Sequence, residues 1–96
     1  MSDDDLTFRD APDASRFELR RGDELVSVLD YRIKDGEIAL TRAFTPPPQR
    51  GQGLAAVITE RAVDEIARRG GLRIQPVCSY VGVWFDAHPE RADLLA

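Results

Sequence analysis

The chain has 96 residues, of which 43% are hydrophobic and 31% are charged, values typical of one compact soluble domain. Its formal net charge of −4 argues against a general nucleic-acid-binding protein, because such proteins normally carry a basic patch that displaces counterions from phosphates. The same acidity could attract a basic amine substrate, or it could simply keep a small protein soluble.

No apolar segment approaches the roughly 20 residues that a membrane-spanning helix needs. The sequence starts with Met-Ser-Asp-Asp-Asp, which lacks the basic and apolar regions of a signal peptide, so we expect a cytoplasmic protein without a membrane partner. Cys78 is the only cysteine and His88 the only histidine. This excludes an intrachain disulfide and argues against a metal site.

The N-terminal part predicts a leader followed by a β-hairpin. Residues 1–15 contain five aspartates and no sustained periodicity, so we interpret them as a loose leader and residues 16–96 as a single domain. Residues 17–20 alternate apolar and charged side chains, and residues 21–24 are typical of a turn. Residues 25–33 form a longer β-rich run, which completes the predicted hairpin.

A third strand should follow directly. Asp35-Gly36 favours a two-residue type I′ turn, in which both central positions need positive φ. Residues 37–45 then alternate in a way that places three apolar side chains and one arginine on the same face. These are Ile38, Leu40, Arg42 and Phe44. The first half of the chain therefore predicts an antiparallel meander.

A helix and a fourth strand are expected after the prolines at residues 46–48, which remove amide donors and end the sheet. From Gly53 to Arg69 apolar residues recur at helical spacing, and Gly70-Gly71 supplies a left-handed exit. The apolar positions are Leu54, Val57, Ile58, Ala62 and Ile66. Residues 72–76 form a short strand, which should pair parallel with the earlier strand because a crossover helix precedes it.

The C-terminal part predicts one more helix. Ser79 could cap it, and Pro89 after His88 marks its end. Its buried stripe would consist of Val81, Trp84 and Phe85. The complete pattern predicts an α/β fold with an antiparallel meander of three strands, a crossover helix, a fourth strand parallel to the third and a C-terminal helix.

The glycine-rich turn before the central helix is the strongest functional signal. Gly51 and Gly53 let backbone amides converge on an anion such as phosphate, and the helix adds the positive end of its dipole. Arg50 can supply a cation to the same anion. The spacing lacks the Lys-Ser/Thr ending of a nucleoside-triphosphate loop and the third glycine of a dinucleotide fold. An ordinary strand-to-helix turn is the alternative, but the meander before it favours the functional interpretation.

The segment Arg50-x-x-Gly53-x-Ala55 resembles the pyrophosphate-binding motif of the GNAT acetyltransferases. The segments Gly51-Gln52-Gly53-Leu54-Ala55, Pro76-Val77-Cys78-Ser79-Tyr80-Val81 and His88-Pro89 are together similar to a group of very short, minimal GNAT-like proteins. The likeness covers roughly residues 16–95 and implies that the core of the fold is retained while much of the substrate-binding apparatus is missing. Many members have His-Thr where this chain has Arg42-Ala43, so no role of that histidine transfers here.

This resemblance implies that the chain binds acetyl-CoA and transfers the acetyl group to an amine on a small molecule or a protein. The cofactor-binding residues implied are Phe44, Thr45, Arg50, Gly51, Gln52, Gly53, Leu54 and Ala55. Catalysis would occur where two parallel strands separate, near Phe44-Thr45 and Ile74-Gln75, and a free backbone amide there could polarise the acetyl carbonyl. Beyond acetyl-CoA and the amine acceptor we expect no nucleic-acid partner, and a monomer or weak homodimer.

Two residues after the last strand are candidates for catalysis. Cys78 could accept the acetyl group, or it could be a small buried apolar side chain. Tyr80 could protonate the departing CoA thiolate, a role implied by the resemblance to larger relatives, or it could only pack. His88 could act as a base, although a His-Pro at a helix end more often terminates the helix. The rival functions are a non-catalytic CoA- or acyl-CoA-binding module and an interaction domain in which the glycine loop is only a turn.

Overall fold

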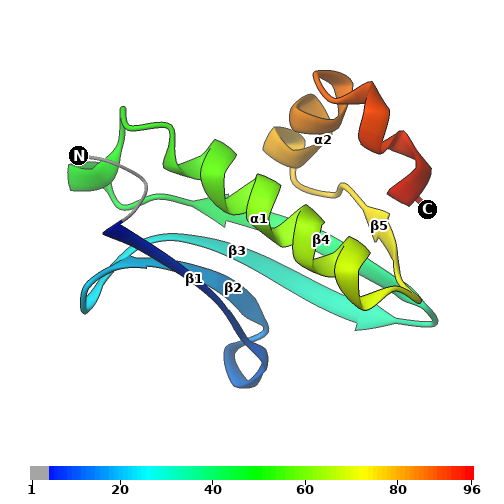
Figure 1. Ribbon diagram of the computed structural model, residues 1–96, viewed down its shortest axis with the longest axis horizontal. Coiled ribbons are helices and arrows are strands. Elements are labelled where there is room, and N and C mark those ends of the chain that lie inside the picture. The colour runs from blue at the N-terminus through cyan, green and yellow to red at the C-terminus, as the bar shows by residue number, and fades with distance from the viewer. Residues whose placement is uncertain (1–4) are drawn as a thin grey trace.

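Five β-strands form one mixed sheet in the order β1-β2-β3-β4-β5, seen in a computed structural model that describes residues 5–96 (Figure 1). The first four strands pair antiparallel as a meander, and the last joins β4 in parallel, as predicted for the strand after the crossover helix. The bounds are β1 (Leu6–Ala11), β2 (Arg16–Arg21), β3 (Glu24–Lys34), β4 (Glu37–Phe44) and β5 (Arg73–Gln75).

Strand β1 corrects the interpretation of residues 1–15 as a loose leader. It pairs with β2 along its whole length, which makes the meander four strands rather than three. Leu6 is buried and the ring of Phe8 stacks on that of Phe17, with 5.4 Å between ring centroids. Along these six residues more buried and more exposed side chains alternate, as the pleat of a strand requires. The segment is too short for this alternation to stand out in the sequence. Residues 1–4 lie outside the described residues.

Helix α1 (Leu54–Arg69) lies across one face of the sheet (Figure 1). Its apolar residues face the strands and are almost completely buried, as the helical spacing predicts. They are Leu54, Ile58, Ala62, Val63 and Ile66. Val63 was not among the predicted positions, and the predicted Val57 is only partly buried. Burial of a leucine or isoleucine side chain contributes about 1.5–3 kcal/mol, so this stripe holds the helix on the sheet. Gly70 and Gly71 have φ values of 73° and 82° and form the predicted exit.

Helix α2 (Ser79–Asp86) follows β5 and buries Val81, Trp84 and Phe85 in the same core, as predicted. Ser79 is its first residue and not its cap, because Cys78 occupies the N-cap position and no side chain caps the helix there. The chain continues into the 3₁₀ turn η4 (Pro89–Leu94), and Leu95 then bridges to Ile74 beside β5. Within the described residues, no helix is long and apolar enough to span a membrane.

A β-bulge interrupts the pairing of β3 with β4. Asp30 pairs with Arg42, whereas the next residue, Tyr31, pairs with Leu40. Thr41 is therefore an extra residue in β4 without a partner in β3. Such a bulge bends the strand and changes the face to which the following side chains point.

The bulge explains one error in the predicted pattern. Ile38 and Leu40 precede it and are completely buried under the helices. Beyond it, Ala43 packs against the core. Phe44 pairs with Val28, and both side chains lie on the face opposite the helices. Ile38, Leu40 and Phe44 therefore do not share a face, because an extra residue reverses the alternation between Leu40 and Arg42.

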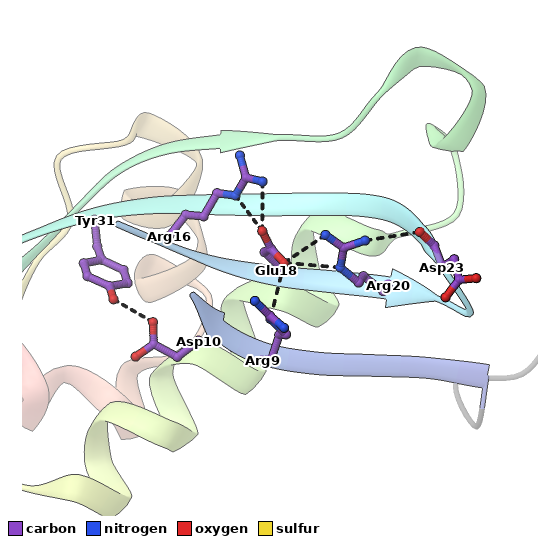
Figure 2. A network of polar contacts seen from close by, with 7 residues as sticks. All are labelled: Arg9, Asp10, Arg16, Glu18, Arg20, Asp23 and Tyr31. Atoms are coloured by element: carbon purple, nitrogen blue, oxygen red, sulfur yellow. Dashed lines mark hydrogen bonds and ion pairs between the residues drawn. The ribbon is translucent and has the colours of Figure 1, made fainter. Parts of the chain in front are cut away.

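The face of the sheet opposite the helices, called the open face below, carries charged side chains (Figure 2). At its centre lies Glu18, whose side chain is only 4% exposed. Its carboxylate accepts hydrogen bonds from Nε of Arg16 at 2.9 Å and Nε of Arg20 at 3.2 Å, and Arg9 Nε lies 3.5 Å away. Burial alone would raise the pKa of Glu18, but the bonds from Arg16 and Arg20 outweigh it and hold the pKa below its usual value.

Candidate active site

The loop between β4 and α1 has a defined conformation. The 3₁₀ turn η3 (Pro47–Gln49) is closed by bonds from the amides of Gln49 to the Pro46 carbonyl at 2.8 Å and of Arg50 to the Pro47 carbonyl at 3.2 Å. The two glycines that follow have left-handed backbones, with φ 87° at Gly51 and 73° at Gly53. A Cβ at either position would meet no atom within 4 Å. Glycine is therefore favoured by the positive φ of the backbone and not by a lack of room for a side chain.

The amides that follow are available to a ligand. Within the described chain, the N–H groups of residues 51–56 donate to no protein acceptor, and the first helical bond runs from Val57 to the Gly53 carbonyl at 3.2 Å. The N-cap Gly53 has no side chain to cap them, and the first turn holds no acidic residue. Free amides at the positive end of a helix dipole form a binding site for an anion.

These amides border a pocket of about 300 Å³. Its lining consists of Thr45, Gln49, Arg50, Gly51, Gly53, Leu54, Ala55, Ala56 and Tyr80. Six of the eight residues predicted to bind a cofactor are therefore together in one hollow. Gln49 and Ala56 were missed, although Ala56 is a small residue in the first turn of the helix, where the pocket begins.

Two predicted cofactor residues, Phe44 and Gln52, do not line this pocket. The ring of Phe44 lies on the open face, where the guanidinium of Arg42 is 4.7 Å and that of Arg50 is 5.9 Å from its centroid. The side chain of Gln52 turns away from the pocket and accepts a hydrogen bond from Nη2 of Arg21 at 3.1 Å. Arg50 is exposed, and its Nε donates to the Thr45 carbonyl at 3.0 Å.

Arg21 at the end of β2 is a site residue that the sequence did not indicate. Besides Gln52 it binds Oε1 of Gln49 through Nη1 at 3.3 Å, and Gln49 in turn donates to Glu24 at 3.0 Å. Nε of Arg21 is buried without a hydrogen-bond partner. The β2–β3 hairpin thus holds the glycine loop in place from a part of the chain 28 and 31 residues away.

Strands β4 and β5 separate close to this pocket. Their pairing covers only residues 37–39 and 73–75, and one further bond joins the Cys78 amide to the Leu40 carbonyl at 2.8 Å. β5 then leads into α2, while β4 continues beside β3 to Phe44. The opening therefore begins after Leu40 and Cys78. The predicted position at Ile74-Gln75 is wrong, because those residues belong to the paired segment.

The two candidate catalytic residues flank this opening. Cys78 is half-buried, packs against the core and occupies the N-cap of α2. Tyr80 lines the pocket and is 36% exposed. Partial burial raises the pKa of Tyr80 above its usual value, because it disfavours the charged phenolate. Among the described residues its hydroxyl has no hydrogen-bond partner.

Comparison with known protein families settles the classification. The family model described as GCN5-related N-acetyl-transferase matches residues 16–94. The chain belongs to the GCN5-related N-acetyltransferase family. Within the solved structures, the ribosomal-protein-S18-alanine N-acetyltransferase from Escherichia coli is similar, with a TM-score of 0.60 and 18% identity over 76% of this chain and 50% of that one. Comparison with curated proteins gave no match.

The structural likeness to the Escherichia coli enzyme concerns the fold, and this GCN5-related N-acetyltransferase spans about half the length of that chain. His88 of this family member lies away from the glycine loop, in a separate hollow between α1 and the C-terminal part. Its ring stacks on Trp84 with 3.9 Å between centroids, and Nδ1 lies 2.7 Å from the Trp84 carbonyl oxygen. These contacts fit a His88 that packs at the end of α2, and they do not fit a base at the glycine loop.

Proposed function

We propose that this GCN5-related N-acetyltransferase binds acetyl-CoA and transfers its acetyl group to an amine. The observation that carries the proposal is the row of N–H groups at residues 51–56, which lack a protein acceptor at the start of α1. A pyrophosphate supplies oxygens of the right charge and spacing for several amides at once. Arg50 adds a guanidinium beside them, and the pocket extends to Tyr80 at the opening between β4 and β5.

The reaction follows from this arrangement. The amine nitrogen attacks the thioester carbonyl carbon, a C–N bond forms, the C–S bond breaks and CoA leaves as a thiolate. Tyr80 is the proposed acid, because it lines the pocket and its phenol carries a proton at neutral pH. The attacking nitrogen loses its proton to water. Phe44 and Gln52, which were predicted to touch the cofactor, are assigned supporting positions beside Arg50 and Arg21.

A second route passes through Cys78. In this route the thiolate of Cys78 attacks the thioester, CoA leaves, and the acetyl-cysteine is then attacked by the amine, which restores the thiol. Cys78 occupies the N-cap of α2, and its amide makes the last bond between the β5 side and β4. The direct and the Cys78 routes give the same products and differ in whether the protein itself becomes acetylated.

A non-catalytic CoA- or acyl-CoA-binding module is the alternative function, and one observation favours it. None of the side chains that line the described pocket is a carboxylate or an imidazole, the groups that most often act as a general base. In that case the same amides would hold the cofactor without transfer.

Calorimetric titration with CoA and acetyl-CoA tests the binding step. Incubation with acetyl-CoA and a panel of primary amines, followed by mass spectrometry, tests transfer. An acetylated amine supports the transferase, whereas tight cofactor binding without any acetylated product supports the binding module. Absence of CoA affinity in a folded sample would remove both.

The two routes are separated by Cys78→Ala and Tyr80→Phe. Loss of an acetyl adduct on the protein and of activity in Cys78→Ala supports the route through the thiol, while unchanged turnover supports direct attack. Tyr80→Phe should lower kcat about tenfold or more with little change in KM for acetyl-CoA, because it removes only a proton donor. Cytoplasmic location and a monomer or weak homodimer stay predictions.

A further inference from the structure

A second hollow, of about 570 Å³, lies on the open face over β3, β4 and β5. Its lining consists of Arg32, Lys34, Asp35, Glu37, Ala39, Thr41, Gln75 and Val77. Two small β4 residues, Ala39 and Thr41, lie between longer side chains of the neighbouring strands. Ala39 pairs with Arg32 of β3 on one side and with Gln75 of β5 on the other. The hollow therefore follows the course of β4.

This hollow and the cofactor pocket adjoin the same opening. Thr41 follows Leu40, the last residue of β4 bonded to the β5 side, and Val77 precedes Cys78, which makes that bond. The cofactor pocket approaches the opening from the loop and from Tyr80. A thioester held in the pocket and an amine held in the hollow would therefore meet at the opening from different sides.

The open face is basic although the chain as a whole is acidic, with a net charge of −4. The registers of β1 to β4 assign to this face six basic residues and three acidic ones. They are Arg9, Arg16, Arg20, Arg32, Lys34 and Arg42 on one hand and Glu18, Asp30 and Glu37 on the other. Asp35 in the hairpin turn adds one acid at the far end of the hollow.

Three of the four acidic residues on the open face already have partners, whereas Asp35 forms no ion pair with any described residue. Glu18 binds three arginines, Asp30 lies 3.5 Å from Arg42, and Glu37 accepts a hydrogen bond from Gln75. Arg32 and Lys34 form no ion pair with any described residue. Both are exposed at the rim of the hollow, so their charges remain available to an anionic group of a partner.

Resting on the proposed function, we infer that the hollow receives the acceptor as an extended polypeptide whose amine lies at Thr41 and whose acidic side chains meet Arg32 and Lys34. Thr41 and Glu37, which both line the hollow, are four residues apart in β4, a span of about 13 Å in a strand. Arg32 lies at the level of Ala39 and Lys34 at that of Glu37. The acidic residues therefore belong at the third and fifth positions, counting the residue with the reacting amine as the first.

The test is the rate of acetyl transfer to three synthetic peptides with free N-termini at saturating acetyl-CoA. They carry Glu, Gln or Lys at both the third and the fifth positions and are otherwise identical. We expect kcat/KM for the Glu peptide to exceed that for the Gln peptide about tenfold, with the Lys peptide slowest. The advantage should fall towards unity at about 0.5 M salt, because charges at an exposed rim are screened.

The double variant Arg32→Gln/Lys34→Gln should remove the preference for the Glu peptide and leave KM for acetyl-CoA and the melting temperature unchanged. Arg68→Gln is the matched control, since it removes a positive charge from the exposed side of α1. It should retain the full preference. A preference that survives the double variant would refute the assigned contacts.

Equal rates for the three peptides, faster transfer to a small amine than to any peptide, or RNA that binds this face in place of the Glu peptide would overturn the inference and leave the proposed transferase intact. If no amine is acetylated while calorimetry still detects acetyl-CoA, the transferase itself fails. The acceptor site then fails with it, and the two failures are distinguishable.

Discussion

Positively charged or hydrogen-bond-donating groups converge at two places in this molecule, and only one of these places contains an acidic side chain. Around Glu18 three guanidinium groups converge on a carboxylate that the chain itself provides. At the start of α1 the amides of residues 51–56 and the guanidinium of Arg50 converge with no acidic residue in the first turn. The first cluster is therefore neutralised within the chain, whereas the second is the anion site of the function proposed above.

The largest effect is expected where the anion belongs to the chain. Glu18→Gln leaves three arginines without their carboxylate and should lower the free energy of unfolding by about 2 kcal/mol, as for the loss of charged hydrogen bonds that are partly open to water. Urea denaturation measures this. CoA affinity should stay the same, and Glu60→Gln on the exposed side of α1 is the control. A fall in CoA affinity would break the separation of the two regions.

Gly53→Ala should lower CoA affinity as well as stability. A Cβ strains a backbone with φ of 73°, and relaxation of that strain redirects the neighbouring amides. We expect CoA affinity to fall about tenfold, which is about 1.4 kcal/mol, in a calorimetric titration. Gly36→Ala is the matched control, because Gly36 has a similar φ of 79° in the β3–β4 turn. It should lose comparable stability and keep its affinity.

A smaller effect is expected for Arg50. Arg50→Gln removes a charge from the exposed edge of the pocket, and CoA should bind about three- to fivefold more weakly at low salt. Arg50→Lys keeps the charge and should recover part of the loss. The difference between the variants should shrink as salt is added. If it persists at high salt, Arg50 acts through its bond to the Thr45 carbonyl and not through its charge.

The smallest effect concerns pH. The pKa of Glu18 is lower in the folded chain than its ordinary value of 4.5, so its contribution to stability is complete above pH 4.5. That contribution is lost as the pH falls through the lowered folded pKa. The difference in unfolding free energy between the wild type and Glu18→Gln should therefore shrink between neutral pH and about pH 3. A difference that does not change with pH would mean that the charge of Glu18 is not what stabilises the cluster.

The features that the sequence predicts well are local ones. The Asp35-Gly36 turn, with φ values of 53° and 79°, follows from the conformations that those two residues tolerate. The buried stripe of α1 follows from helical spacing, and the parallel pairing of β5 from the crossover before it. The glycine loop and most of its pocket follow in the same way, because Gly51–Ala55 is one continuous segment.

The features that the sequence misses depend on partners far along the chain. β1 is too short to show its alternation, and only pairing with β2 makes it a strand. The contact of Arg21 with Gln52 joins residues that no periodicity connects. Net charge also does not report how charge is distributed, since an acidic chain carries a basic open face over β1 to β4.

The bulge at Thr41 affects two properties of β4, the face to which each side chain points and the curvature of the backbone. Deleting this one residue would leave Arg42, Ala43 and Phe44 on their present sides of the sheet, since the alternation from Leu40 would then continue regularly. The curvature of the backbone beside the opening would change, and the Thr41 side chain would no longer line the hollow. The shape of this end of the sheet thus depends on chain length, while the faces to which Arg42, Ala43 and Phe44 point do not.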